Sequence, residues 1–264
     1  MTFKITEPLV RKLLATVDVG LSRGLGEPIP GKMCVEAAIS YALGEPHSDG
    51  PSCVDPIVRQ AKITLNDAAW SSEQARAKGM RRVAIAQLGS KGTINATRFV
   101  TLLAEYTIRE LVPVALRAAA LLNPSHAQAL EGRAVQCERD GDKAAADAAY
   151  AAAKAADAAA NAAYAAAYAA YAAAKAADAA ANAADAAAYA AYAAKAAANA
   201  SYAAYAAYAA KAAANAAYAA NAANAERDRN LSLSASLMVR ALHECGSPGC
   251  EWLWLVDETE KEGA

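Results

Sequence analysis

Apolar residues in the first 140 positions recur at the three- and four-residue spacing of amphipathic helices. Leu9, Leu13, Leu14 and Val17, for example, fall on one helical face, and this spacing is typical of a helix with one buried side. No stretch of this region alternates apolar and polar positions as a half-buried strand would. The pattern therefore predicts an all-α fold.

Capping residues and helix breakers divide this region into separate helices. Thr, Ser, Asp and Asn favour the residue before a helix, Pro favours its first turn, and Gly favours the residue after its last turn. Pro113 is expected to kink or break a helix, because proline removes a backbone donor. The helices predicted in this way run from Thr6 through Val17, from 32 to 44, from Asp55 to about Asn66, from Ser71 or Ser72 to Leu88, from Ala96 to about Leu111, and from Asn123 and Pro124 to about Gly141.

A different pattern fills residues 143–225, where 57 of the 83 residues are alanine and none is Gly or Pro. Alanine has the highest helix propensity, so this tract is predicted to be helical. Its larger residues recur in steps of four and three up to Tyr189, which is the heptad spacing of a coiled coil. Residues 154–174 are followed by a near copy of themselves, and such a repeat suggests units that stack on their neighbours.

After Tyr189 several consecutive steps of three appear, and each of them turns the polar stripe by about 60° around the helix. One straight seam therefore cannot serve the whole tract. Either the tract consists of helices folded back on one another, or it is one rod whose contacts change partner midway. A helical bundle, formed within one chain or between copies, is favoured because so large an alanine surface is unsuited to remaining in water.

Beyond the tract, residues 226–245 have the pattern of a further helix, with Leu231, Met238 and Leu242 as its apolar positions. Residues 250–256 are compact and apolar, and they predict either a short strand or a terminal plug. We therefore expect an N-terminal helical domain (1–141), an inserted Ala-rich repeat (142–225), and a C-terminal helix and plug (226–264) that pack on the N-terminal domain.

Charge and composition narrow the classes of function. The formal net charge of −1 gives no electrostatic basis for binding nucleic acid or a membrane surface. Charged or Asn residues interrupt the alanine tract every few positions, which argues against a membrane span. The first residues lack the apolar core of a signal peptide, and five scattered cysteines fit a reducing cytoplasm better than a disulfide framework. A cytoplasmic protein is expected.

The segment GEPIPGKM at 26–33 matches most of the phosphate-binding pattern G-x-x-x-x-G-K-[ST]. Gly31 and Lys32 occupy its final Gly and Lys positions, but Met33 replaces the hydroxyl that would hold magnesium. Pro28 and Pro30 each remove a backbone N–H that would face a phosphate. An ordinary loop between helices is therefore favoured, and no cofactor is expected.

Cys34 is a candidate nucleophile because it stands at a predicted helix start, where the helix dipole and Lys32 would lower the pKa of its thiol. His47 is the first candidate for its base, with His126 and His243 as others. The alternative is a buried, unreactive cysteine on an apolar helix face. Cys34, His47 and Cys53 would provide only three zinc ligands at irregular spacing, so no metal site is expected.

Basic residues crowd one predicted helix, and together with Lys32 they are candidates for contacts with the phosphates of a ligand; the alternative is a solvated helical face. They are Arg76, Lys78, Arg81 and Arg82. Tyrosines of the tract are candidates for contacts with a partner, because tyrosine combines contact area with a polar tip. They are Tyr164, Tyr168, Tyr171, Tyr189, Tyr192, Tyr202, Tyr205 and Tyr208.

Four segments resemble parts of uncharacterised bacterial and phage proteins that carry Ala/Tyr-rich repeats. They are GKMCVEAAISYALG (31–44), LNDAAWSS (65–72), ARAKGMRRVAIAQLG (75–89) and SPGCEWL (247–253). The resemblance covers both flanks of the tract and implies a bacterial or phage cytoplasmic setting, but it implies no activity and no catalytic residue. The Ala-rich helix is also similar to helical antifreeze proteins, which present a flat array to ice.

These observations favour a non-enzymatic binding or scaffolding protein. The expected partner is another protein, or a second copy bound through the Ala-rich helices, and a small molecule is a further possibility. A role in conflict between phage and bacterium, by sequestering a partner, is compatible with this hypothesis. The competing hypothesis is a cysteine-dependent enzyme or a nucleotide-binding domain that uses Cys34, Gly31, Arg81 and Arg82. A third is ice or surface binding.

Overall fold

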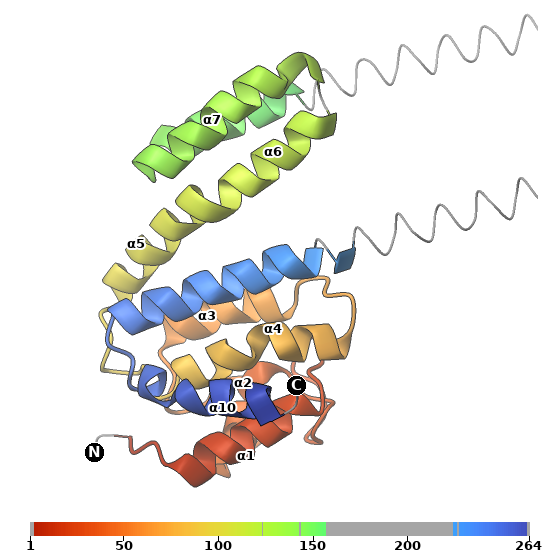
Figure 1. The fold of residues 1–264 in the computed structure, drawn as a ribbon. Coiled ribbons are helices and arrows are strands. Elements are labelled where there is room, and N and C mark those ends of the chain that lie inside the picture. Colours follow the sequence, from red (N-terminus) through yellow and green to blue (C-terminus); the bar gives the residue numbers. More distant parts are fainter. Residues whose placement is uncertain (1–2, 123, 143, 157–223, 226, 263–264) are drawn as a thin grey trace, which may run out of the picture.

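A computed structural model describes residues 3–122, 124–142, 144–156, 224–225 and 227–262 (Figure 1). Within these ranges the regular elements are all helices, and the only extended pairing is an isolated bridge between Gly26 and Met33. The predicted all-α class is therefore confirmed. The tract tyrosines proposed as partner contacts, together with the predicted coiled-coil or bundle arrangement of residues 157–223, lie outside the described residues.

The helices follow one another closely along the chain. The first part contains α1 (Glu7–Asp18), α2 (Val35–Leu43), α3 (Pro56–Asn66), α4 (Glu73–Ala86) and α5 (Ala96–Tyr106). The second contains the π-helical segment η1 (Thr107–Leu111), α6 (Val112–Leu122), η2 (Pro124–His126), α7 (Ala127–Asp140) and a helix at 144–156. A helix at 227–244, η3 (Pro248–Trp252) and α10 (Trp254–Glu262) complete the described chain.

Local capping explains where three of these helices start. Asp55 accepts a hydrogen bond from the backbone N–H of Ile57 at the start of α3, Ser72 accepts one from Ala75 at the start of α4, and Asn95 accepts one from Arg98 at the start of α5. Each bond satisfies a backbone donor that the first helical turn leaves unpaired. The predicted starts of these three helices are confirmed.

Pro113 does not break the helix in which it lies. The chain passes from α5 through η1 into α6, and the N–H of Val112 bonds to the carbonyl of Thr107, five residues earlier. A wider π-helical turn accommodates the missing donor and the bulk of the proline ring just beyond it. Because α6 follows η1 directly, the predicted helix end near Leu111 is wrong.

Buried apolar residues form two clusters. The larger joins α1 to α5, the helix at 227–244, η3 and α10, and its most enclosed members include Leu13, Ile39 and Met80. The second joins α6, α7 and the helix at 144–156 around Leu130 and Cys137. The continuous helix formed by α5, η1 and α6 connects the two clusters (Figure 1).

The C-terminal segment packs closely on α4. Ser247 donates from its hydroxyl to the carbonyl of Ala86 at 2.6 Å, and the N–H of Gly249 donates to the carbonyl of Leu88 at 2.9 Å. A Cβ on Gly249 would lie 2.0 Å from the carbonyl oxygen of Ile85, so only glycine permits this approach. Residues 250–256 are helical rather than a strand, and the strand alternative is wrong.

None of the helices in the described ranges combines the length and the apolar character needed to cross a lipid bilayer.

Candidate functional site

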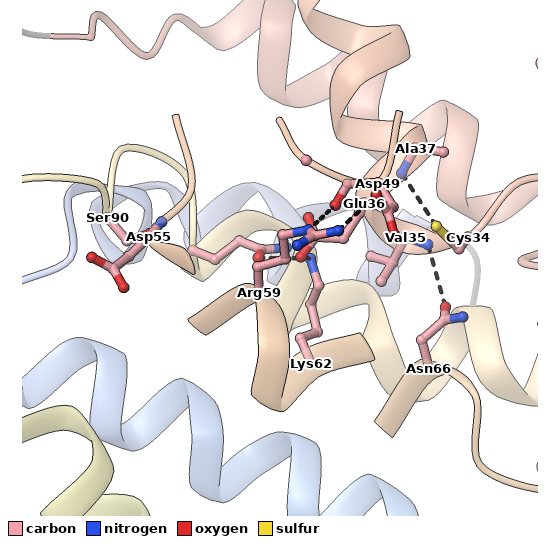
Figure 2. Close-up of polar contacts among 12 residues, drawn as sticks. Cys34, Val35, Glu36, Ala37, Asp49, Asp55, Arg59, Lys62, Asn66 and Ser90 are labelled. Carbon is pink, nitrogen blue, oxygen red and sulfur yellow. Dashed lines mark hydrogen bonds and ion pairs between the residues drawn. The ribbon is translucent and has the colours of Figure 1, made fainter. Parts of the chain in front are cut away.

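Two of the polar clusters among the described residues border an open space. One is a buried cluster between α2 and α3, which contains Cys34 (Figure 2). The other is a groove between α4 and the helix at 227–244. The first contains the candidate nucleophile, and the second contains part of the basic cluster.

The centre of the buried cluster is an ion pair between Glu36 on α2 and Lys62 on α3 (Figure 2). The two side chains are 1% and 0% exposed. Lys62 Nζ also donates to Gln87 Oε1 at 2.6 Å. Among the described residues, Glu36 Oε2 and Gln87 Nε2 have no hydrogen-bond partner, so the cluster is only partly satisfied.

Burial dominates the electrostatics of this pair. It raises the pKa of Glu36 and lowers the pKa of Lys62, because it penalises the charged form of each group. The attraction between the two groups opposes both shifts. Arg59 and Asp49 form a second, more exposed ion pair at 2.7 Å in the same cluster (Figure 2).

Beside this cluster lies a cavity of about 30 Å³. Cys34 and Glu36 line it from α2, and Asn66 and Asp67 line it from the end of α3. A cavity of this size holds about one water molecule. This cavity has no room for a substrate, and the ion pair beside it joins α2 to α3.

Cys34 caps α2 rather than acting as an activated thiol. Its Sγ accepts a hydrogen bond from the N–H of Ala37 at 3.4 Å, and the side chain belongs to the main apolar cluster. Burial raises the pKa of the Cys34 thiol, so the lowering expected from the helix start and Lys32 is wrong. Lys32 pairs instead with Glu27 at 3.4 Å, and His47 Nε2 lies 3.1 Å from the carbonyl oxygen of Gly26.

The segment at 26–33 directs its backbone donors to its own carbonyls. The N–H of Glu27 donates to the carbonyl of Lys32 at 2.7 Å, and the N–H of Lys32 donates to the carbonyl of Ile29 at 2.9 Å. A phosphate-binding loop needs such donors to face the ligand. The hairpin-like loop that includes Gly31 is therefore the ordinary connection that the sequence favoured.

Two of the four basic residues of α4 are buried against other parts of the chain. Arg76 donates to the backbone carbonyls of Leu21 and Asn66, both at 2.8 Å, and is buried. Arg81 forms a two-point ion pair with Asp18, at 2.7 and 3.0 Å, and donates to Thr259 Oγ1 at 2.7 Å. These guanidinium groups hold the loops and α10 against α4.

Lys78 and Arg82, the other two, line the groove, which has a volume of about 400 Å³. Positions one helical turn apart share a face, and both walls of the groove follow this rule. The α4 wall consists of Ala75, Lys78, Gly79 and Arg82, and the opposite wall consists of Ala225, Asp228, Arg229, Ser232, Ala235 and Ser236. The second wall was not predicted, although its polar positions recur at helical spacing in the sequence.

Gly79 shapes the floor of the groove. A Cβ at this position would lie 2.2 Å from the ring of Trp70, so the glycine allows the indole to pack directly beneath α4. Trp70 is buried, and its ring N–H donates to the carbonyl of Leu65 at 3.0 Å. The floor is therefore shallow, apolar and backed by a rigid aromatic ring.

The charged groups at the groove are engaged to different degrees. Asp228 accepts hydrogen bonds from the N–H and the hydroxyl of Ser71, just before α4. Arg82 forms an ion pair with Asp257, and both side chains remain largely in solvent. Lys78 is exposed. The carboxylate of Asp228 thus links the helix at 227–244 to the residue before α4. Lys78 and Arg82 line the groove from the opposite wall.

No group of three or more His, Cys, Asp or Glu side chains in the described part of the chain is arranged to hold a metal ion. Comparison with protein-family models, with curated proteins and with solved structures finds no match for this chain. Its function therefore has to be inferred from its own geometry.

Proposed function

We propose that this chain is a non-enzymatic binding protein, and that its helical body holds a partner in the groove between α4 and the helix at 227–244. The observation that supports this proposal most directly is the contrast between the two polar sites. The groove offers about 400 Å³ with charged residues at its opening, within the usual range of ligand sites. The cavity at Cys34 offers about 30 Å³.

The position of the groove also suits a binding role. Its second wall begins at Ala225, the last residue of the Ala-rich tract. A partner seated in the groove would therefore contact the helix that continues from the tract. Presentation of the tract tyrosines to a protein partner, or self-association through the tract, remains part of this proposal, as do a cytoplasmic setting and a sequestering role.

The enzymatic alternative has less support. A nucleophilic cysteine requires a thiolate and a base within hydrogen-bond reach. Burial raises the pKa of Cys34, and the ring of His47 contacts a backbone carbonyl instead. No observation favours the ice-binding alternative.

The proposal can be tested by filling the groove. Ser236 is exposed and lines the groove, so Ser236→Trp would occupy it with little disturbance to the core. Ala129→Trp is the matched control, because Ala129 is an exposed residue of α7, remote from the groove. The full-length proteins would be screened by thermal shift against a metabolite panel and by native mass spectrometry for co-purifying compounds.

We expect one or more compounds to stabilise the wild-type protein and Ala129→Trp but not Ser236→Trp. Compounds that stabilise Ser236→Trp equally, or the absence of any binder, would overturn the proposal. A compound that the wild-type protein converts chemically and Cys34→Ala does not would overturn it in favour of an enzyme.

A further inference from the structure

We infer that the groove between α4 and the helix at 227–244 is a site for a small molecule that carries a phosphate group. This inference rests on the proposed binding function and specifies the class of ligand. It follows from the placement of cationic side chains around the groove, from the engagement of its one carboxylate, and from its apolar floor.

Cationic groups reach the groove from both of its walls. Lys78 and Arg82 stand one turn apart on α4, and Arg229 stands on the opposite helix. Guanidinium groups match the geometry of phosphate oxygens, and lysine adds a mobile point charge. A phosphate between the two helices would therefore meet positive charge on more than one side.

The cationic residues that line the groove outnumber its carboxylate, since Lys78, Arg82 and Arg229 stand against Asp228 alone. Asp228 lines the groove, but its two carboxylate oxygens accept hydrogen bonds from the backbone and hydroxyl of Ser71. Asp257 pairs with Arg82 and is about half exposed. An ion pair so open to water is weak, so a phosphate can replace Asp257 as the partner of Arg82 without a large loss.

The floor of the groove suits the uncharged part of such a ligand. Ala75, Gly79 and Ala235 leave a shallow apolar surface, with the Trp70 ring directly behind Gly79. Ser232 and Ser236 add hydroxyl groups along the second wall. A flat organic body with a phosphate at one end, as in a nucleotide, fits this division into an apolar floor and a cationic rim.

Adenosine 5′-monophosphate, inorganic pyrophosphate and adenosine are the probes for this inference. Binding to the full-length protein would be followed by calorimetry and by tryptophan fluorescence, since Trp70 lies beneath the floor. We expect both phosphate-bearing probes to bind more tightly than adenosine, with affinities that fall as salt increases. Equal binding of adenosine and adenosine 5′-monophosphate would overturn the inference.

Lys78→Glu and Lys91→Glu form a matched pair of variants. Both lysines are exposed, and each substitution changes the net charge equally, but only Lys78 lines the groove. Lys78→Glu is expected to weaken binding of the phosphate-bearing probes at least about tenfold, whereas Lys91→Glu should change it less than about twofold. Equal weakening by both variants would show a general charge effect and would refute a site.

The two proposals fail in distinguishable ways. If neither phosphate-bearing probe binds, but another compound binds in a manner that Ser236→Trp abolishes, the phosphate inference falls and the binding function stands. If nothing binds that Ser236→Trp affects, both fall.

Discussion

Replacing Lys62 with methionine tests whether the buried ion pair governs the stability of the main cluster. Lys62 is fully buried, pairs with Glu36 and donates to Gln87 Oε1. Methionine preserves most of its volume but leaves a buried carboxylate without its cation. Removing one partner of a buried pair costs about 3–5 kcal/mol, so we expect Lys62→Met to lose about 4 kcal/mol of unfolding free energy. A typical domain has only about 5–15 kcal/mol in total.

The double variant Glu36→Leu with Lys62→Met should recover much of this loss. Replacing both members of a buried pair with apolar residues is often neutral or stabilising by about 1–4 kcal/mol. The unpaired Gln87 amide that remains would cost about 1–3 kcal/mol, so we expect the double variant to lie within about 2 kcal/mol of the wild-type protein. Urea unfolding followed by tryptophan fluorescence measures all of these values, since Trp70 is buried.

The pH dependence of Lys62→Met provides an independent check. Burial raises the pKa of Glu36, and Lys62 opposes that shift, so the variant should raise the pKa further. A group whose pKa is higher in the folded state stabilises fully below its unfolded pKa and loses this contribution as pH rises through the folded pKa. The variant should therefore regain stability as pH falls toward 4.5, the ordinary value for Glu36. A double variant as unstable as Lys62→Met, or a single variant that loses less than about 1 kcal/mol, would refute this account of the pair.

Three further predictions follow from the same geometry. Gly249→Ala should destabilise the protein by about 3 kcal/mol, because its Cβ would lie 2.0 Å from a backbone oxygen. The control Gly132→Ala, in open space within α7, should stabilise by about 0.5–1 kcal/mol, and equal effects in urea unfolding would contradict the predicted contact. Burial raises the pKa of Cys53 from 9.0 to about 11. Between these two pH values the thiol is ionised in the unfolded protein but still protonated in the folded one, so rising pH destabilises the fold. The wild-type protein should therefore lose about 2–3 kcal/mol more than Cys53→Ala between pH 9 and 11, and parallel pH curves from urea titrations would contradict this. Cys34, buried and with a raised pKa, should react with iodoacetamide at least about 1,000-fold more slowly in the native than in the unfolded protein. Peptide mapping by mass spectrometry would disprove this if native Cys34 reacted as fast as the less buried Cys245.

Features encoded by neighbouring residues could be predicted from the sequence. Asp55 followed by Pro56, Ser72 and Asn95 each carry their structural signal within one helical turn, and each stands at the start of a helix. The glycine after α2 likewise ends that helix in the left-handed conformation that glycine adopts without strain. Such signals require no knowledge of what packs against the helix.

Features that depend on packing were predicted less well. The helix continues through Pro113 because a π-helical turn precedes it, and nothing within the sequence of that turn requires it. Residues 250–256 were ambiguous because a short apolar run suits a strand or a buried helix equally. Ser247 and Gly249 contact the end of α4, about 160 positions earlier in the sequence. These contacts hold residues 250–256 in a position where they form helical turns.

The buried ion pair did leave a signal in the sequence, although it is one that pattern analysis passes over. Val58, Lys62 and Leu65 stand at i, i+4 and i+7, so the lysine interrupts an otherwise apolar stripe of α3. In α2, Glu36 stands among apolar residues near the start of the helix, and that arrangement favours a buried carboxylate. A buried charge needs a partner, and a lone buried acid on one helix therefore implies a lone buried base on another. The groove could not be predicted in this way, because an exposed charged residue does not need a partner of opposite charge. Lys78 and Arg229 could each face solvent on an isolated helix, and only the fold places them across one opening.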